Sequence, residues 1–250
     1  MVDVKGRWAL ITGASRGIGA LSALYMAEMG CNLILHSRKP EHMTEILEKV
    51  KAFGVEAYAV SAELSKPEEV EAMLAEIDAK GTCVDIVLNN AGLQIAYRND
   101  YYKTPISDYT ESFQINIISP IMICYHFLPK MIERGFGRIV NTTSGIALEP
   151  EQAGYSASKA ALDKVTIDLG SKLEGTDVMI NLTDPGWCRT DLGGPHAPNA
   201  PESAIPGVLV GAFVDDKKSG RHLNAQYFAG MTLEDAVKKA EAEFDSPYAK

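Results

Sequence analysis

The chain has 250 residues, 46% hydrophobic and 23% charged, a composition that supports a sizeable core and argues against disorder. Its formal net charge of −9 opposes binding to DNA or RNA, because that binding relies on clustered Lys and Arg side chains that neutralise phosphates. No apolar run approaches the roughly 18 residues that cross a bilayer, and the N-terminus lacks a signal-peptide pattern, so we expect a cytoplasmic protein without nucleic-acid or membrane partners.

Short apolar segments rich in β-formers alternate with longer amphipathic segments. The predicted strands are Trp8–Thr12, Asn32–His36, Glu56–Val60, Asp85–Asn90, Arg138–Thr143 and Val178–Thr183. The predicted helices are Gly17–Met29, Glu41–Phe53, Pro67–Ala79, Asp108–Glu133 and Tyr155–Leu173. Because neighbouring parallel strands need a crossover connection, this alternation predicts an α/β fold of the Rossmann type, a doubly wound parallel sheet flanked by helices.

No linker or composition shift divides this series, so we expect a single domain over residues 1–250. Four prolines interrupt the segment from about 190 to 214, which is expected to form either a lid over the cleft or a plain surface connection, with a short helix over Pro201–Val214. Thr232 and Asp235 are spaced as a capping box, which predicts an atypical C-terminal helical tail over about 231–250.

A glycine-rich turn follows the first strand and opens the first helix, with the sequence Thr12-Gly13-Ala14-Ser15-Arg16-Gly17-Ile18-Gly19. Glycines let the backbone approach a pyrophosphate closely, and the helix N-terminus directs unpaired N–H groups and its dipole at the negative charge. The position of the turn, between the first strand and the first helix, favours dinucleotide binding over a purely structural turn.

Three later motifs, Asn89-Asn90-Ala91-Gly92, Tyr155-Ser156-Ala157-Ser158-Lys159 and Pro185-Gly186, follow in the order and near the spacing of a known family. From about Lys5 to Asp191 the sequence resembles the short-chain dehydrogenase/reductase family, with members that act as 3-oxoacyl or carbonyl reductases. The resemblance implies a nicotinamide-dependent oxidoreductase that interconverts a carbonyl and a secondary alcohol and forms a homo-oligomer, either a dimer or a tetramer.

The end of the second strand indicates the cofactor. An NAD site usually has an acidic residue there that binds the ribose hydroxyls and would repel a 2′-phosphate. Here the strand ends in His36, Ser37 and Arg38, with no acid before Glu41, and Arg16 lies in the glycine-rich turn. Guanidinium groups match phosphate geometry, so we expect NADP(H) to be preferred over NAD(H), unless both arginines are merely solvated surface charges.

Tyr155 and Lys159 are four residues apart on a predicted helix and therefore share one face. A phenol titrates near pH ~10, and a neighbouring ammonium together with an oxidised nicotinamide is expected to favour the phenolate, so that Tyr155 can act as the proton donor or acceptor. Ser144 follows the fifth strand and is expected to bind the substrate carbonyl, although it precedes Tyr155 by 11 positions, one or two fewer than in the family. By resemblance, Asn116 holds a water in a proton path to the lysine; satisfaction of a buried polar group is the alternative.

The residues expected to bind the cofactor, several of them by resemblance, lie in the first turn, at the ends of the second to fourth and sixth strands, and on the helix that begins at Tyr155. These are Gly13, Ser15, Arg16, Gly17, Ile18, Gly19, Ser37, Arg38, Glu63, Leu64, Asn90, Ala91, Gly92, Tyr155, Lys159, Pro185, Gly186, Trp187 and Thr190. No metal site is expected, because the four cysteines are scattered without zinc-ligand spacing.

Loop residues expected at the mouth of the cleft are Gln94, Tyr97, Tyr101, Tyr102, Trp187 and Tyr227. The aromatic ones suggest a partly apolar carbonyl substrate; the alternatives are that they pack the lid, or that Tyr227 is buried at an interface of a homotetramer. Two other functions stay open: a sugar or sterol dehydrogenase that runs oxidatively, and a non-catalytic NADP-binding sensor. The intact set of catalytic residue types argues against the sensor, since a binding module has no need of an acid.

Overall fold

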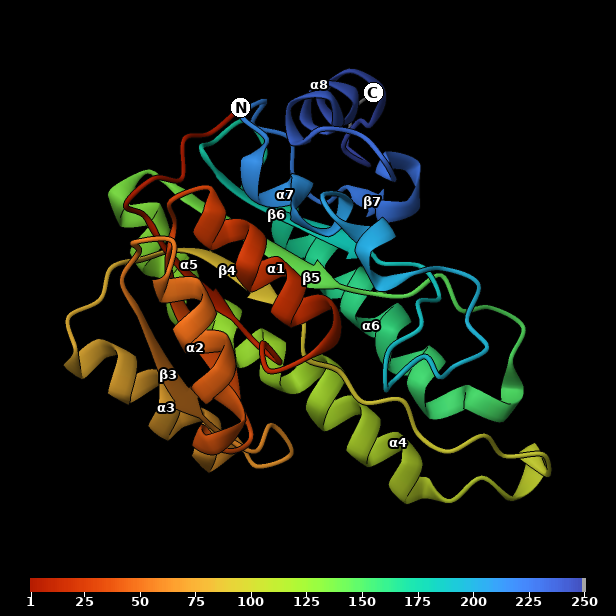
Figure 1. The fold of residues 1–250 in the computed structure, drawn as a ribbon. Coiled ribbons are helices and arrows are strands. Elements are labelled where there is room, and N and C mark those ends of the chain that lie inside the picture. Colours follow the sequence, from red (N-terminus) through yellow and green to blue (C-terminus); the bar gives the residue numbers. More distant parts are fainter. Residues whose placement is uncertain (249–250) are drawn as a thin grey trace.

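The computed structural model describes residues 1–248 and has a seven-stranded parallel sheet at its centre (Figure 1). The strands are β1 (Trp8–Ile11), β2 (Asn32–Ser37), β3 (Ala57–Ser61), β4 (Val84–Asn89), β5 (Gly137–Thr142), β6 (Val178–Asp184) and β7 (His222–Asn224). Their order across the sheet is β3-β2-β1-β4-β5-β6-β7. The chain adds β2 and β3 on one side of β1 and the later strands, from β4 onward, on the other side, so the strand order reverses between β1 and β4. This confirms the predicted doubly wound sheet, while the three-residue strand β7 is an addition that the sequence pattern does not predict.

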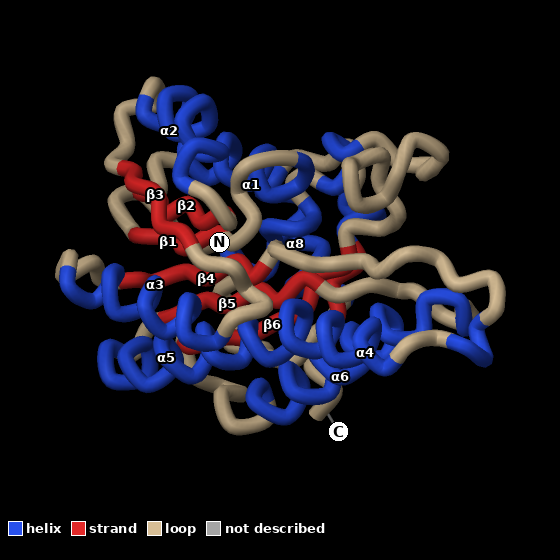
Figure 2. The backbone as a smooth tube through the Cα atoms, turned by 90° about the horizontal axis from the view of Figure 1, so that it is seen from below, coloured by secondary structure: helices blue, strands red, loops and turns tan. Residues whose placement is uncertain are grey.

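Helices cover both faces of the sheet (Figure 2). One face carries α1 (Gly17–Glu28), α2 (Thr44–Lys51), α7 (Val210–Phe213) and α8 (Leu233–Glu243). The other carries α3 (Pro67–Ala79), α4 (Ile106–Phe113), α5 (Ser119–Arg134) and α6 (Ala153–Gly170). Each face has its own cluster of buried apolar side chains, which explains why the central strands are mostly apolar without alternation.

A π-helical segment, η3 (Gln114–Ile118), joins α4 to α5, so the helical stretch runs without a break from Ile106 to Arg134. By length and composition this stretch could cross a membrane, but 56% of its most apolar window is buried inside the protein. Ile123, Phe127 and Met131 belong to the apolar cluster beneath β4 and β5, which identifies the stretch as a core helix.

The segment 201–214 differs from the short helix predicted for Pro201–Val214. It forms three short pieces: η5 (Pro201–Ala204), η6 (Gly207–Leu209) and α7. Pro206 lies between the first two pieces, where a proline has no N–H group with which to continue a helix. The remaining single-turn helices are η1 (Pro40–Met43), η2 (Tyr101–Lys103), η4 (Pro150–Gln152) and η7 (Ala225–Phe228).

The C-terminal part packs on the same face as α1. Thr232 caps α8, because its hydroxyl accepts a hydrogen bond from the Asp235 N–H (3.1 Å) and donates one to the Asp235 carboxylate (2.8 Å). Ala236, Val237 and Ala240 of α8 are buried in the apolar cluster of that face. Of the tail expected over about 231–250, residues 249 and 250 lie outside the described residues.

Candidate active site

The carboxyl ends of β1 and β4 flank the point where the strand order reverses, which is where ligands bind in sheets of this kind. The glycine-rich turn lies there. Gly13 has a φ of +65°, and a Cβ atom added to Gly19 would lie 2.2 Å from the Gly13 carbonyl oxygen, so a side chain at position 19 would clash with the turn. Within residues 1–248 no side chain caps the N-terminus of α1, which leaves its N–H groups available to an anion.

Asn90 is expected at the cofactor, but its side-chain amide hydrogen-bonds the glycine-rich turn itself. Its Nδ2 donates to the carbonyl oxygens of Thr12 (3.0 Å) and Gly13 (3.3 Å). The Thr12 hydroxyl in turn accepts a hydrogen bond from the Ala91 N–H (3.0 Å). These contacts hold the turn against the end of β4, and they give Thr12 a positioning role that the sequence analysis did not assign.

The residues expected around the adenosine end of the cofactor differ in their exposure and in their contacts. Arg38 is exposed at the end of β2, whereas Ser37 is buried and its hydroxyl donates to the Lys39 carbonyl oxygen (2.7 Å). Arg16 forms an exposed ion pair with Asp191 (2.9 Å), which bridges the turn and the loop after β6.

The two candidate residues at the end of β3 have their own local contacts. The Glu63 carboxylate accepts from the Ser65 N–H (3.3 Å), and the side chain of Leu64 is buried. The side chains of Arg16, Ser37 and Glu63 each have a hydrogen-bond or ion-pair partner. The exposed side chain of Arg38 has no such partner among the described residues.

Tyr155 and Lys159 lie on one face of α6, both buried, with 7% and 4% of their surface exposed. The Lys159 Nζ is 5.8 Å from the centroid of the Tyr155 ring and donates to the Thr142 carbonyl oxygen at the end of β5 (2.7 Å). Burial lowers the pKa of Lys159 to about 8, although the carboxylates of Asp163 and Asp184 act to raise it.

The Ser144 hydroxyl accepts a hydrogen bond from the Ile146 N–H (3.3 Å) and lies close enough to Tyr155 to influence the pKa of its phenol, in spite of the short spacing between the two residues. Burial raises the pKa of Tyr155 above its ordinary value, the nearby Ser144 hydroxyl lowers it, and the Asp184 carboxylate raises it further, so that the net direction is upward. Among the chain's own residues, loss of solvation thus outweighs the effect of Ser144, and the lowering expected from the ammonium together with an oxidised nicotinamide stays an expectation.

Asn116 lies in the π-helical segment, a local distortion that often marks functional sites. Its amide pairs with both backbone groups of Leu93: Oδ1 accepts from the N–H and Nδ2 donates to the carbonyl oxygen, each at 2.8 Å. Nδ2 also donates to the Ser158 hydroxyl (3.0 Å), which donates to the Tyr155 carbonyl oxygen (2.7 Å). The side chain therefore joins the loop after β4 to α6, which agrees with the buried-polar alternative.

Asp184, at the end of β6, is a residue that the sequence analysis missed. Its Oδ2 accepts from the Gly145 N–H (3.0 Å), next to Ser144, and its Oδ1 accepts from the Gly186 N–H (2.9 Å). Asn224 of β7 donates to the same carboxylate at 3.5 Å. One buried side chain thus links the candidate catalytic serine, the loop after β6 and the last strand.

The loop after β6 passes the glycine-rich turn. A Cβ atom added to Gly17 would lie 3.3 Å from the Thr190 methyl group, so Thr190 is adjacent to the turn. Gln226 donates to the Pro185 carbonyl oxygen (2.7 Å), and the exposed Trp187 donates to that of Gly193 (2.7 Å), which holds the loop in shape. Gly92 lies on the other side, with Lys159 Nζ and Asn116 Oδ1 each 3.5 Å from the position of an added Cβ atom.

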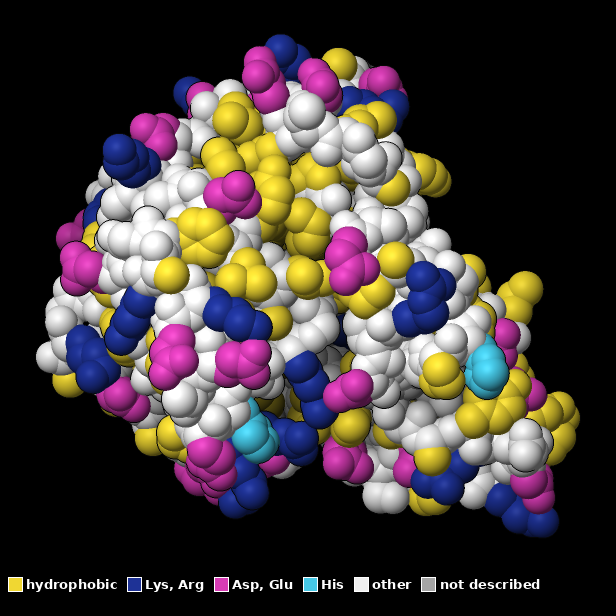
Figure 3. Space-filling view, in the orientation of Figure 1, with side chains coloured by type: hydrophobic (Ala, Val, Ile, Leu, Met, Phe, Trp, Pro, Cys, Tyr) yellow, Lys and Arg dark blue, Asp and Glu magenta, His cyan; other side chains and the backbone are white. Residues whose placement is uncertain are grey.

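The aromatic residues expected at the mouth are exposed, but three of them lie on single-turn helices rather than loops: Tyr101 and Tyr102 on η2, and Tyr227 on η7. The segment that contains η2 and precedes α4 projects as a lobe at the lower right of Figure 1. In the space-filling view a recess separates this lobe from the body of the molecule (Figure 3). Tyr227 instead packs toward Phe244, with ring centroids 6.1 Å apart.

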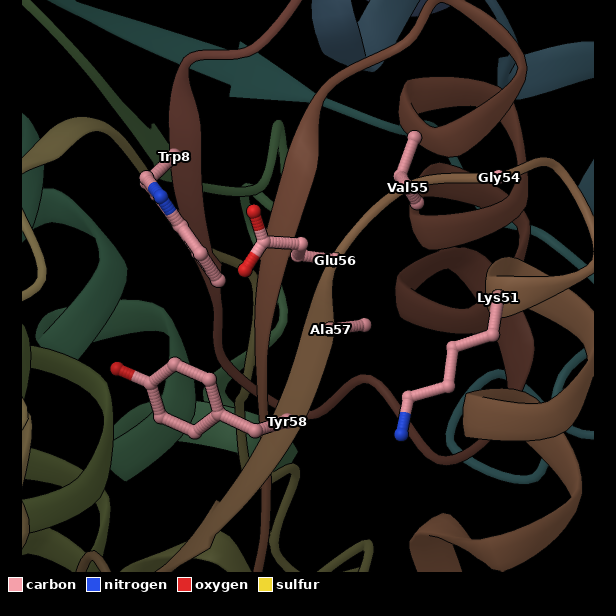
Figure 4. Close-up of a pocket in the computed structure, with 7 residues that line it drawn as sticks. All are labelled: Trp8, Lys51, Gly54, Val55, Glu56, Ala57 and Tyr58. Atoms are coloured by element: carbon pink, nitrogen blue, oxygen red, sulfur yellow. The ribbon is translucent and has the colours of Figure 1, made fainter.

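A second hollow is lined by Trp8, Lys51 and the segment 54–58 (Figure 4). Trp8 is the first residue of β1 and Ala57 the first of β3, so this hollow lies at the amino edge of the sheet. It is therefore opposite the edge that carries Tyr155 and the glycine-rich turn.

The strand order and the glycine-rich turn at its reversal define a dinucleotide-binding α/β protein. The family model for short chain dehydrogenases matches residues 7–200, and the chain belongs to this family. It is 28% identical over 234 residues to the 3-oxoacyl-[acyl-carrier-protein] reductase FabG of Staphylococcus epidermidis, with 90% of this chain and 95% of that protein covered.

Solved structures agree with this assignment. A short chain dehydrogenase of Salmonella enterica superposes with a TM-score of 0.80 and 25% identity, covering 89% of this chain and 97% of that one. A 3-oxoacyl (acyl-carrier-protein) reductase of Agrobacterium tumefaciens, solved with NADP bound, superposes with a TM-score of 0.73 and 27% identity, covering 95% and 90%.

The Asp184 contacts lead to a first prediction. In Asp184→Asn the amide has one acceptor oxygen instead of two, so either Gly145 or Gly186 loses its partner and the Ser144 loop shifts. We expect kcat of the oxidoreductase reaction to fall roughly tenfold, the size expected from one unsatisfied buried N–H group. Asp245→Asn, at an exposed ion pair, is the control. Full kcat in Asp184→Asn would show that the link is dispensable.

Proposed function

We propose that this chain is an NADP(H)-dependent oxidoreductase that interconverts a carbonyl and a secondary alcohol, with Tyr155 as the acid or base. The observation that carries the proposal is the buried pair of Tyr155 and Lys159, with the half-buried Ser144 beside the phenol, at the same sheet edge as the glycine-rich turn. A buried phenol beside a serine hydroxyl suits proton transfer to an oxygen held between them.

The residues at the sheet edge fit a nicotinamide dinucleotide. The turn from Gly13 to Gly19 and the uncapped N-terminus of α1 would hold the pyrophosphate, and Thr190 and Gly92 border the same space. When bound, the dinucleotide supplies or accepts the hydride. The other residues assigned to it from the sequence, including Ile18, Ala91 and Pro185, stay part of the proposal.

The chain's own side chains account for the remaining chemistry. Ser144 orients the substrate oxygen and stabilises its developing charge, and Tyr155 holds the proton at its hydroxyl oxygen. Lys159 keeps a positive charge next to the phenol, anchored by the Thr142 carbonyl group. Asn116 fixes the helix that carries both, through Ser158.

The preference for NADP(H) rests on the end of β2, where Arg38 is exposed and no acidic side chain follows before Glu41. The Agrobacterium tumefaciens relative with NADP bound supports this preference. We also propose one domain over the whole chain, a cytoplasmic location and a homo-oligomer. The exposed apolar side chains Ile106, Tyr125 and Ile132 along the α4–α5 stretch support the oligomer.

Removal of the Tyr155 hydroxyl tests the proposed chemistry. Tyr155→Phe keeps the buried ring but has no proton to transfer, so we expect kcat to fall at least about a hundredfold while NADPH binding stays within about twofold. NADPH oxidation against a panel of carbonyl compounds gives kcat, and fluorescence titration gives Kd. Full turnover in this variant would contradict the assignment of Tyr155 as the acid.

A charge reversal tests the cofactor preference. Arg38→Asp should weaken NADPH binding at least about tenfold, because the carboxylate repels the 2′-phosphate, and should change NADH binding little. Kd values for both cofactors provide the readout. Lys164→Asp, at an exposed cation on α6, controls for the change in net charge. Equal loss of both affinities would remove Arg38 from the phosphate site.

The rate of carbonyl reduction should depend on pH through Lys159. The pKa of Lys159 is lowered to about 8 and that of Tyr155 is raised, so as pH rises through about 8 the ammonium loses its charge while the phenol keeps its proton. We expect kcat to decline above that pH. Lys159→Arg, whose guanidinium stays charged, should move the decline upward. Profiles that coincide from pH 6 to pH 10 would contradict the role given to this charge.

A further inference from the structure

The side chain of His36, the penultimate residue of β2, is buried with 1% of its surface exposed, and both ring nitrogens have partners. Nδ1 lies 3.3 Å from the backbone nitrogen of Gly13, and Nε2 lies 3.0 Å from the carbonyl oxygen of Ala62. Because the Gly13 N–H can only donate and the Ala62 oxygen can only accept, Nδ1 must be unprotonated and Nε2 must carry the proton. The contacts therefore require a neutral ring in a single tautomer.

The backbone around His36 strengthens the same connections. The Ala14 N–H donates to the His36 carbonyl oxygen (2.9 Å), and the Ala62 N–H donates to that of Ser37 (3.3 Å). His36 thus joins three segments at the carboxyl ends of β1, β2 and β3. All three belong to the proposed dinucleotide site: the glycine-rich turn, the Ser37–Arg38 pair and the Glu63–Leu64 pair.

We propose that His36 is a positioning residue for the dinucleotide: its neutral imidazole fixes the glycine-rich turn against the loop after β3, and tight cofactor binding requires the neutral ring. This inference rests on the proposed function, because it assumes that these loops hold NADP(H). His36 is too deeply buried for direct contact with a ligand to be assigned to it, so it acts through Gly13 and Ala62.

Protonation of the ring would break this arrangement. A second proton on Nδ1 would face the Gly13 N–H, and neither group would then have an acceptor. Burial lowers the pKa of His36, while the Ala62 carbonyl group and the Glu63 carboxylate act to raise it. Of the other charged groups on the joined segments, Arg16 and Arg38 are exposed to solvent. Cofactor affinity is therefore expected to be full at neutral pH and to fall on the acid side.

Three substitutions separate the two ring contacts. His36→Asn places an amide near the position of Nδ1 and can still accept from Gly13, whereas His36→Gln places its amide near Nε2 and can still donate to Ala62. His36→Leu fills the same space with an apolar side chain and loses both contacts. Gly13 belongs to the pyrophosphate turn, so the contact that His36→Asn retains should matter more for the cofactor.

The experiment measures Kd for NADPH by fluorescence from pH 5 to pH 9, with kcat at saturating NADPH and thermal unfolding for each variant. We expect His36→Leu to raise Kd roughly tenfold at neutral pH, the size of one unsatisfied buried N–H group, with kcat within about twofold. His36→Asn should bind NADPH more tightly than His36→Gln. It should also lose the acid-side fall in affinity that the unmodified protein shows.

Unchanged Kd in His36→Leu, or an acid-side fall that persists in His36→Asn, would overturn the inference. A uniform loss of thermal stability that accounts for the affinity loss in all three variants would do the same. Kd is measured without turnover. If the unmodified protein binds NADPH but reduces no carbonyl compound, this result contradicts the proposed chemistry and leaves the inference about His36 intact. A protein that binds neither NADPH nor NADH overturns both.

Discussion

The burial of the Lys159 ammonium against the end of β5 is the interaction on which the rest of the site depends. A charge with 4% of its surface exposed needs strong compensation, and the chain supplies the Thr142 carbonyl oxygen together with the carboxylates of Asp163 and Asp184. Loss of solvation still dominates, since the pKa falls to about 8. The ammonium is therefore held near its titration point, where small changes around it alter its charge.

Buried asparagine amides hold the elements that surround this charge. Asn89 at the end of β4 donates to Asn141 of β5 (2.8 Å), and Asn141 donates to the Thr166 hydroxyl of α6 (2.9 Å). Asn116 makes the parallel connection from the loop after β4 to α6 through Ser158. An amide both donates and accepts, so it can bridge two elements without adding a charge beside Lys159. The register of α6, and with it the position of Tyr155, is fixed from two sides.

Sequence periodicity predicted the parts of this structure that repeat. The first six strands and the helices between them follow from hydrophobic pattern, and the glycine-rich turn follows from its place after β1. The contacts that were missed have no periodic signal: Asp184 reaches Gly145 across 39 residues, and His36 reaches Gly13 and Ala62 from another strand. Strand β7 escaped because three residues are too few for a pattern. The upward pKa of Tyr155 depends on burial, which local sequence does not reveal.

The short connection between Ser144 and Tyr155 is hydrogen-bonded at both ends and exposed between them. Its two ends are tied down, at Gly145 by Asp184 and at Gln152 by the Ile95 carbonyl oxygen (3.0 Å). Between them Leu148 is 99% exposed with a φ of +60°, so the loop points this apolar side chain into solvent. The reacting groups thus lie on fixed strand and helix ends, while the rim is built from loops that contact one another. Substrate choice should therefore diverge among relatives faster than the reaction does.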